Sequence, residues 1–485
     1  MVDQEARPHG VVRTGLLSMV ALAALGLTRL VHGSLVSRAT DPQTYGRVGA
    51  LIALTTIASL LLPAGVASAT AKFVPYLSGS GDPVAARTAY HLLSRLGVAG
   101  SVLFGLGAGG AAALLFNLTG GEIAQVAALA ITFSLYSIDK ATLYGYQRIT
   151  AYVRLELCTS ALAVLATVLV VVAGWTAYLV PLALAYGVFS VVARWLVRGE
   201  VHGPTGGLGV VPRGEILGFV ALACLGTLSS QGFLQGTQLL AVHFATPAEV
   251  GYFAAAVTLV TPMYFLPRAL GLALFPTMAR AHGAGDLATV RKQADVSTRA
   301  LLVVLAPVFA VGILLAREVL VLFGRQAYAA GAPVLQLMLA ATFLAVCAVA
   351  TVNALSSGDR RQVRTPVAAA LTGCLTGLAT VAVLGGPLGA AGVGIGYLAG
   401  TAVTSAGPAV AVWRQHRMAW RTPALRALVV VGGALAIAWA LRGLDLSRGA
   451  RVLVDVAVAA VAGLVSVGFL VGQMRAVLRD ARAPV

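Results

Sequence analysis

The chain has very few charged residues. Only 11% of its 485 residues are Asp, Glu, Lys or Arg, whereas soluble proteins carry about 25%. Hydrophobic residues make up 59% of the chain, and the mean hydropathy is +0.89. This composition excludes a soluble enzyme, a disordered chain and a disulfide-rich scaffold. It indicates a membrane protein that crosses the bilayer many times.

Cysteine and lysine are scarce as well. Lysine accounts for three of the 34 basic residues, so arginine supplies most of the net charge of +17. None of the four cysteines has CxxC spacing, and each lies in an apolar run. We interpret them as small buried packing residues rather than metal ligands or a disulfide framework. They are Cys158, Cys224, Cys347 and Cys374.

Motifs for enzymatic chemistry are missing. The sequence has no HExxH motif, no paired Asp motif, no phosphate-binding Gly loop and no Ser/His/Asp constellation. The longest segments outside the apolar stretches, near 72–91, 198–215 and 277–297, hold only about 20 residues, too few for a catalytic domain. We therefore expect no enzymatic activity, no cofactor and no metal. A membrane-embedded polysaccharide polymerase or glycosyltransferase is the least favoured alternative.

Fourteen apolar stretches are long enough to cross a bilayer, which requires about 20 residues per helix. They predict an all-α polytopic membrane protein with about 14 transmembrane helices. The stretches are 14–36, 48–71, 92–116, 122–143, 153–173, 177–197, 216–242, 250–276, 298–316, 333–355, 366–384, 390–413, 424–441 and 453–473.

The basic residues alternate sides in this arrangement. With a cytoplasmic N-terminus, 26 of the 34 Lys and Arg residues fall on the cytoplasmic side and 8 on the outer side. This is the positive-inside pattern, and it predicts that both termini are cytoplasmic. Because the charges sit in short loops, we expect anionic membrane lipid, and not nucleic acid, as their neighbour.

An internal repeat divides the chain. Pro42 and Gly46 recur as Pro247 and Gly251, and Gly81-Asp82 recurs as Gly285-Asp286, at offsets of 205 and 204. An offset that spans six helices predicts two parallel six-helix lobes, related by an axis along the membrane normal. The predicted organisation is an N-terminal lobe, a C-terminal lobe and two additional helices, at residues 1–205, 206–415 and 416–485.

Two segments of the repeat carry a family resemblance. The segment 30–46 (LVHGSLVSRATDPQTYG) resembles the opening of polysaccharide-export flippases, in which the first helix leads into an acidic-Pro and aromatic-Gly turn. The segment 239–253 (LLAVHFATPAEVGYF) is similar to that family's connection between helices seven and eight. The 6 + 6 + 2 plan also resembles the multidrug/oligosaccharidyl-lipid/polysaccharide exporter superfamily.

This resemblance implies a function. Such a protein would flip an undecaprenyl-linked oligosaccharide across the bacterial plasma membrane by alternating access, with polysaccharide assembly proteins as possible partners. Family members often carry an Asp in the seventh helix, where this chain has the sequence SQGFLQ at residues 230–235.

Two arginines lie inside predicted spans. Arg29 is about 6 Å from the centre of the first span, toward the outside, and Arg268 is about as far from the centre of the eighth, toward the cytoplasm. An intramembrane charge indicates a functional site, but an arginine at this depth also reaches the interface by snorkelling. His32 lies about one turn beyond Arg29, either as part of one cationic face or as a satisfied interior histidine.

Other polar side chains point to a cleft between the lobes. Gln231, Gln235 and Gln238 are spaced i, i+4 and i+7 on the seventh span, which predicts one polar stripe. Their amides suit either sugar hydroxyls or neighbouring helices. Tyr264 lies between Pro262 and Pro267 in the eighth span, where we expect a kink.

Acidic residues distinguish two transporter classes. Asp139 and Glu156 are placed near the cytoplasmic ends of their spans, and no carboxylate is expected at a midplane. A cation-coupled multidrug antiporter would place carboxylates there to bind Na⁺ or H⁺ and a cationic drug. A basic cleft suits a pyrophosphate, which Arg binds bidentately. The antiporter is the alternative to the flippase.

Overall fold

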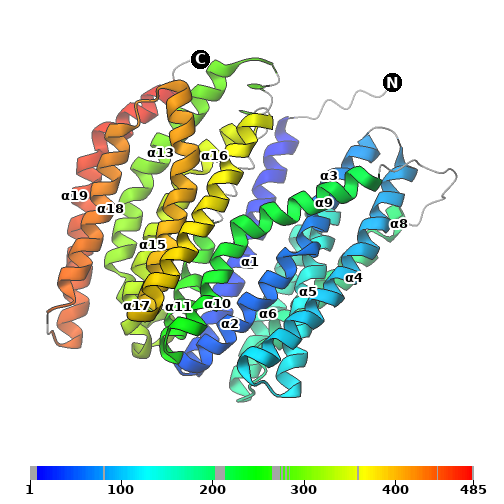
Figure 1. Cartoon of the computed structure of the whole chain (residues 1–485), viewed down its shortest axis with the longest axis horizontal. Helices are drawn as coiled ribbons and strands as arrows, with labels where there is room; N and C mark the ends of the chain where they lie inside the picture. The colour runs from blue at the N-terminus through cyan, green and yellow to red at the C-terminus, as the bar shows by residue number, and fades with distance from the viewer. Residues whose placement is uncertain are drawn as a thin grey trace. The chain divides into compact units, whose positions relative to one another are not determined.

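The structure, a computed structural model, describes residues 8–79, 82–201, 213–264, 274, 277–278, 281–282, 284–357, 360–444 and 446–482, and the ordered elements there are helical (Figure 1). The chain forms two compact units. Unit 1 comprises Met1–Thr40 and Arg47–Leu239, and unit 2 comprises Asp41–Gly46 and Leu240–Val485. The all-α fold predicted from the sequence is confirmed.

Unit 1 is built from the helices that precede residue 240, except that the start of the second helix, up to Gly46, belongs to unit 2. They are α1 (Pro8–Ala39), α2 (Pro42–Leu60), α3 (Leu62–Gly79), α4 (Pro83–Phe116), α5 (Gly120–Gly145), α6 (Ile149–Val172), α7 (Val180–Leu196), α8 (Arg198–Val201), α9 (Arg213–Thr227) and the π-helical η1 (Leu228–Gly232). Helix α1 packs against α6, and α5 packs against α3, α4 and α7. Helix α10 (Phe233–Phe244) carries the chain from unit 1 into unit 2.

The second predicted span is bent. Helices α2 and α3 meet at Leu61 with an angle of 50° between them. Pro63 lies in the first turn of α3, where its ring and its missing N–H prevent α2 from continuing. The bend therefore has a cause that is visible in the sequence.

Unit 2 contains the remaining helices. They are α11 (Pro247–Val260), η2 (Thr261–Tyr264), α13 (Leu287–Leu314), α14 (Ala316–Gly324), η3 (Gln326–Gly331), α15 (Ala332–Cys347), α16 (Val349–Ser356), α17 (Arg360–His416), α18 (Arg421–Leu441) and α19 (Arg448–Arg482). The last two, α18 and α19, both pack against α13 (Figure 1).

Helix α17 is a hairpin of two helical arms. Its 57 residues would extend about 85 Å if straight, but Gly389 has non-helical backbone angles, with φ of 53°. A Cβ atom added at Gly373 would lie 2.5 Å from the carbonyl oxygen of Gly400, and one at Gly392 would lie 2.0 Å from that of Leu384. The two arms therefore run antiparallel in close contact, and they correspond to the predicted spans 366–384 and 390–413.

The predicted spans lie on helices wherever the structure describes them. Within the described residues, nine helices are long and apolar enough to cross a membrane, and the bent α2–α3 pair makes a tenth. Helix α17 counts once among these although it holds two predicted spans, and α7 is apolar but shorter. The total of fourteen stays a prediction, as do the boundaries of the two lobes.

Helix caps repeat where the sequence repeats. Asp82 caps α4 by accepting a hydrogen bond from the backbone N–H of Ala85, and Asp286 caps α13 in the same way from Thr289. Asp41 accepts from the backbone N–H of Thr44, which holds the pKa of the Asp41 carboxyl below its ordinary value. The equivalent aspartates Asp82 and Asp286 thus have the same local role.

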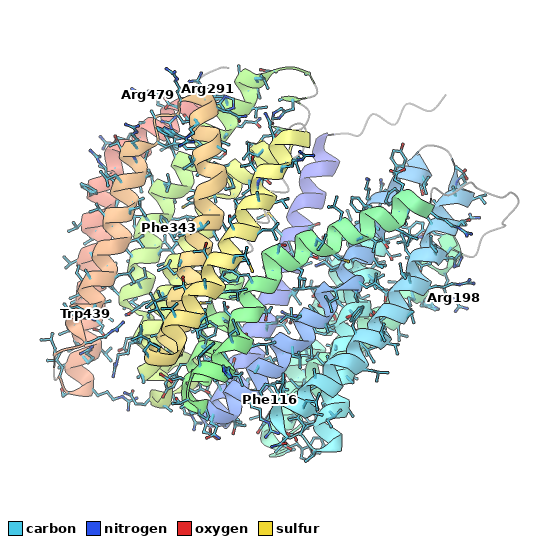
Figure 2. All side chains as sticks on the ribbon, in the orientation of Figure 1. Phe116, Arg198, Arg291, Phe343, Trp439 and Arg479 are labelled. Atoms are coloured by element: carbon cyan, nitrogen blue, oxygen red, sulfur yellow. The ribbon has the colours of Figure 1, made fainter. Side chains whose placement is uncertain are left out.

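Three side chains mark the two ends of the helices of unit 2. Arg291 and Arg479 lie at one end of its helices, and Trp439 lies near the other end (Figure 2). The sequence places both arginines on the cytoplasmic side and Trp439 near the outer interface. The separation of the two ends agrees with that assignment, and which end faces the cytoplasm stays a prediction.

Candidate functional site

Arg29 reaches into the helix packing of unit 1. Its Nε donates a hydrogen bond to the hydroxyl of Tyr186 on α7 over 3.2 Å. Its guanidinium carbon lies 4.8 Å from the centre of the Phe133 ring on α5. The residue is half-buried. These contacts combine a hydrogen bond with a cation–π interaction, both of which strengthen away from water.

The position of Tyr186 along α7 shows whether the Arg29 side chain extends to the helix end, as snorkelling requires. Tyr186 is six residues into α7, which begins at Val180, so it lies about 9 Å from that helix end. The Arg29 guanidinium is held at this level by the Tyr186 hydroxyl. In this conformation the side chain points into the unit instead of extending to the helix end.

Aromatic rings surround this arginine. The Tyr136 ring lies 4.9 Å from that of Tyr186 and 4.7 Å from that of Phe189, and Phe133 lies 5.1 Å from Tyr186. They are supplied by α5 and α7, which pack on each other. The rings cover part of the guanidinium and give it favourable π-face contacts.

A buried carboxylate lies in the same network. The hydroxyl of Tyr136 donates to Oε2 of Glu156 over 2.9 Å, and Glu156 is 2% exposed. The Nζ of Lys140 lies 5.7 Å from the centre of the Tyr136 ring. Unit 1 therefore holds Arg29, Lys140 and Glu156 around shared aromatic side chains.

Two acidic residues of unit 1 are buried. Asp139 and Glu156, which we expect near the cytoplasmic ends of their spans, are 3% and 2% exposed. Helix α6 begins at Ile149, so Glu156 is two turns inside it. Asp139 forms an ion pair with Arg194 at 3.0 Å. Burying these carboxylates requires the partners that the structure supplies.

His32 lies in unit 1 as well, but its side chain contacts a different helix, α6. Its Nδ1 is 2.8 Å from the hydroxyl of Thr167 on α6, and that hydroxyl donates to the carbonyl of Ala163. With the Thr167 proton used in this way, His32 donates through Nδ1 and leaves Nε2 as an acceptor. The residue is 2% exposed, and Nε2 has no hydrogen-bond partner among the described residues.

The glutamine stripe is less regular than predicted. Gln231 lies in η1, a π-helical segment, whereas Gln235 and Gln238 lie in α10. A π-helical turn shifts the angular spacing on which the i, i+4, i+7 pattern depends. Gln231 is exposed, Gln235 is half-buried and Gln238 is 3% exposed. The three side chains do not share one environment, and their role in binding stays a prediction.

The remaining candidates belong to unit 2. Helix α11 ends at Val260 and continues as the 3₁₀-helical η2, so the helix changes geometry next to Pro262. The hydroxyl of Tyr264 lies 2.7 Å from that of Tyr397 on α17. Arg268 and Pro267 lie outside the described residues.

Five residues of the network were not identified as site residues from the sequence: Phe133, Tyr136, Lys140, Glu156 and Tyr186. Tyr136 and Lys140 are spaced i, i+4 on α5, which is a detectable signal for one helix face. Tyr186 carries no signal, because a tyrosine in an apolar run is common. The cysteines follow the expectation only in part: Cys347 is buried, Cys224 and Cys374 are half-buried, and Cys158 is exposed on α6.

The network has the donors for an anion. Tyr186 is the one hydrogen-bond acceptor of Arg29 among the described residues, and a guanidinium has five N–H donors. Phosphate oxygens accept two parallel bonds from such a fork. The buried Nε2 of His32 adds an acceptor about one turn away on the same helix.

Comparisons with known proteins identify the family. A model of the family described as polysaccharide biosynthesis protein matches residues 35–330, which is more than half of the chain. No curated protein sequence matches significantly. Three solved structures show the fold.

The lipid II flippase MurJ, in an inward closed conformation, has a TM-score of 0.66 at 11% identity, over 95% of this chain and 99% of that chain. A MOP superfamily transporter from Pyrococcus furiosus has a TM-score of 0.59 at 16% identity, over 84% of this chain and 95% of that one. A point mutant of the Vibrio cholerae MATE transporter VcmN has a TM-score of 0.58 at 14% identity, over 84% and 96%.

The family match covers the first repeat and the start of the second, where the two resembling sequence segments lie. The structural matches cover most of the chain at low identity, so they establish the fold. The chain is a member of the polysaccharide biosynthesis protein family, with the fold of the multidrug/oligosaccharidyl-lipid/polysaccharide exporter superfamily.

Proposed function

We propose that this protein flips an anionic, polyprenyl-(pyro)phosphate-linked oligosaccharide across the plasma membrane during surface polysaccharide biosynthesis. The family and the fold support a transporter. The observation that carries the choice of substrate is the Arg29 guanidinium, held inside unit 1 by Tyr186 and Phe133.

Arg29 suits a phosphate for three reasons. Its guanidinium keeps unused N–H donors, since one hydrogen bond to Tyr186 is made within the described part of the chain. Arginine stays charged at any physiological pH. The surrounding aromatic rings lower the local dielectric, so a charge-assisted hydrogen bond there is stronger than one in water.

The sugar part of the substrate calls for neutral polar groups. The Nε2 atom of His32 is a buried acceptor suited to a sugar hydroxyl. Amides of Gln231 and Gln235, which are not buried, provide both donors and acceptors. In the proposed transport cycle the polyprenyl tail stays in lipid, and the two lobes expose the headgroup to one side at a time.

The alternative is a cation-coupled multidrug antiporter. Two observations favour it: Glu156 is a buried carboxylate in unit 1, and several structural relatives are MATE transporters. However, Glu156 already accepts a hydrogen bond from Tyr136 and has Lys140 beside the same ring. A compensated carboxylate binds a cationic drug less well than a free one.

A deletion strain tests the proposal. We expect the lipid-linked oligosaccharide to accumulate inside the cell while surface polysaccharide is lost, with the glycan structure of the accumulated intermediate complete. Complementation by the wild-type gene restores both. If the protein is instead an antiporter, its overexpression confers resistance to cationic dyes and its deletion leaves the surface glycan intact. If the protein is a polymerase, its deletion leaves single repeat units on the outer face, and this result would contradict the proposal as well.

A further inference from the structure

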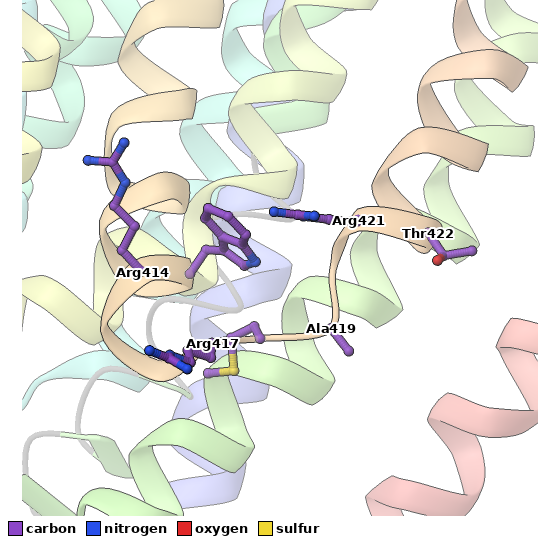
Figure 3. A pocket seen from close by; sticks show the side chains of 7 residues that line it. Arg414, Arg417, Ala419, Arg421 and Thr422 are labelled. Carbon is purple, nitrogen blue, oxygen red and sulfur yellow. The ribbon is translucent and has the colours of Figure 1, made fainter.

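A basic pocket lies where α17 passes into α18 in unit 2. Its volume is about 490 Å³, within the range of small-molecule sites, about 300–1,000 Å³. Figure 3 shows Arg414 and Arg417 at the end of α17 and Arg421 at the start of α18. The lining residues are Trp413, Arg414, Arg417, Met418, Ala419, Arg421 and Thr422.

The charge of this pocket is uncompensated. It is lined by three guanidinium groups and by no carboxylate. None of the three arginines forms an ion pair within the part of the chain that the structure describes. The guanidinium carbon of Arg421 lies 4.9 Å from the centre of the Trp413 ring, a cation–π contact that holds the side chain beside the pocket. An anion with several oxygens fits this arrangement.

The backbone beneath the pocket is anchored. Met418 and Trp420 are 5% and 6% exposed, and they pack into an apolar cluster of unit 2. The indole Nε1 of Trp420 donates to Oδ1 of Asp295 on α13 over 2.7 Å. These contacts hold the connection between α17 and α18 in place, so the arginines project from a fixed support.

An apolar surface begins directly beside the arginines. Leu425, Leu428 and Val429 on α18 are 64%, 51% and 57% exposed. They are spaced i, i+3 and i+4, so they share one face of the helix, a few residues beyond Arg421. In a membrane protein such a face contacts acyl chains, and the Trp413 ring is typical of the headgroup level.

We propose that this pocket binds the phosphodiester headgroup of an anionic glycerophospholipid in the cytoplasmic leaflet, with its acyl chains along α18. The arginines recognise the phosphate, and the exposed α18 face favours a lipid over a free phosphate. The sequence predicts this connection on the cytoplasmic side. The site is separate from the Arg29 network, so the proposal does not depend on the proposed transport substrate.

The test uses the purified full-length protein in detergent and native mass spectrometry. The probe is dioleoyl-phosphatidylglycerol, with dioleoyl-phosphatidylethanolamine of the same chains and glycerol 3-phosphate as comparisons. The test variant carries Arg414→Gln, Arg417→Gln and Arg421→Gln. The matched control carries Arg95→Gln, Arg154→Gln and Arg213→Gln, which remove the same charge from exposed arginines of unit 1.

We expect phosphatidylglycerol to bind the wild type and the control alike, and the test variant at least tenfold more weakly. Glycerol 3-phosphate should not displace the lipid at equal concentration. Equal losses in the two triple variants would show diffuse charge attraction and overturn the proposal. Full competition by glycerol 3-phosphate would also overturn it, in favour of a soluble anion. If the test variant is recovered poorly, Arg421→Gln alone, with Arg213→Gln as control, gives the same comparison.

Discussion

The backbone of Gly46, in the first turn of α2, packs directly against the backbone of Gly251 in the first turn of α11. A Cβ atom added at Gly46 would lie 2.6 Å from the backbone nitrogen of Gly251, and one at Gly251 would lie 1.9 Å from the carbonyl oxygen of Pro42. The two glycines are equivalent in the sequence repeat. The repeat therefore places a residue without a side chain at both of the helix starts that meet here.

Gly251→Ala should destabilise the protein strongly. The added methyl group overlaps backbone atoms, which cannot rotate away, so one of the two helix starts must shift. Overpacking of this kind costs about 1–3 kcal/mol or more. We expect a lower melting temperature and a lower folded yield in fluorescence-detected size-exclusion chromatography. Gly432→Ala on α18 is the matched control, since nothing lies within 4 Å of its added Cβ. Equal melting temperatures for both variants would contradict the close contact.

The fourteen-span topology can be checked with single cysteines. We expect Gly121→Cys and Gly386→Cys to react with impermeant thiol reagents in intact cells. Gly199→Cys and Gly214→Cys should react only after the cells are lysed. An added Cβ meets open space at all four positions. The background replaces the four native cysteines, because Cys158 is exposed on α6. Labelling of Gly199→Cys in intact cells would contradict the predicted orientation.

Two of the ion pairs of unit 1, Asp139–Arg194 and Arg148–Glu200, should differ in their contribution to stability. Asp139 is 3% exposed and pairs with Arg194, whereas the side chains of Arg148 and Glu200 are 54% and 27% exposed. We expect Asp139→Asn to cost about 1–3 kcal/mol, because it removes the charge of the buried carboxylate that pairs with Arg194. Glu200→Gln should cost about 0–1 kcal/mol. Thermal unfolding of both variants in the same detergent checks this order, and a larger loss for Glu200→Gln would reverse it.

Much of the fold follows from the sequence because apolar runs have few structural alternatives in a bilayer. Backbone groups in lipid must be paired within the helix, so each run of about 20 apolar residues becomes helical. Pro63 and Gly389 mark the bend in α2–α3 and the turn in α17. The π-helical segment at Leu228–Gly232 was not predictable in this way, because one extra residue per turn leaves no trace in composition.

The candidate site was predictable only in part. Arg29 and His32 were identified because charge and imidazole are rare inside apolar spans. Their partners Tyr186 and Thr167 come from helices more than 130 positions away, and no local pattern indicates which helices pack together. Glu156 was identified as an acidic residue of a span, but its hydrogen bond with Tyr136 on α5 was not.

The role of Arg29 is tested by measuring whether Arg29 variants restore surface polysaccharide in a deletion strain. The guanidinium is held by Tyr186 and Phe133 inside unit 1, and in the proposed function it binds the substrate phosphate. Arg38→Ala is the control, since Arg38 is an exposed arginine on the same helix. All variants are compared at native expression levels, with folded protein quantified in the membrane fraction.

We expect Arg29→Ala to be present and folded but unable to restore surface polysaccharide, while Arg38→Ala restores it. The lost charge-assisted hydrogen bonds amount to roughly 1.5–3 kcal/mol, or more than tenfold in affinity for the phosphate. Arg29→Lys should restore surface polysaccharide partly, because lysine keeps the charge but lacks the planar fork. Tyr186→Phe removes the acceptor that orients the guanidinium, so its effect should be smaller than that of Arg29→Ala. If Arg29→Ala restores the polysaccharide fully, the arginine serves packing or the membrane interface, and the search for the phosphate site moves to the glutamines of η1 and α10.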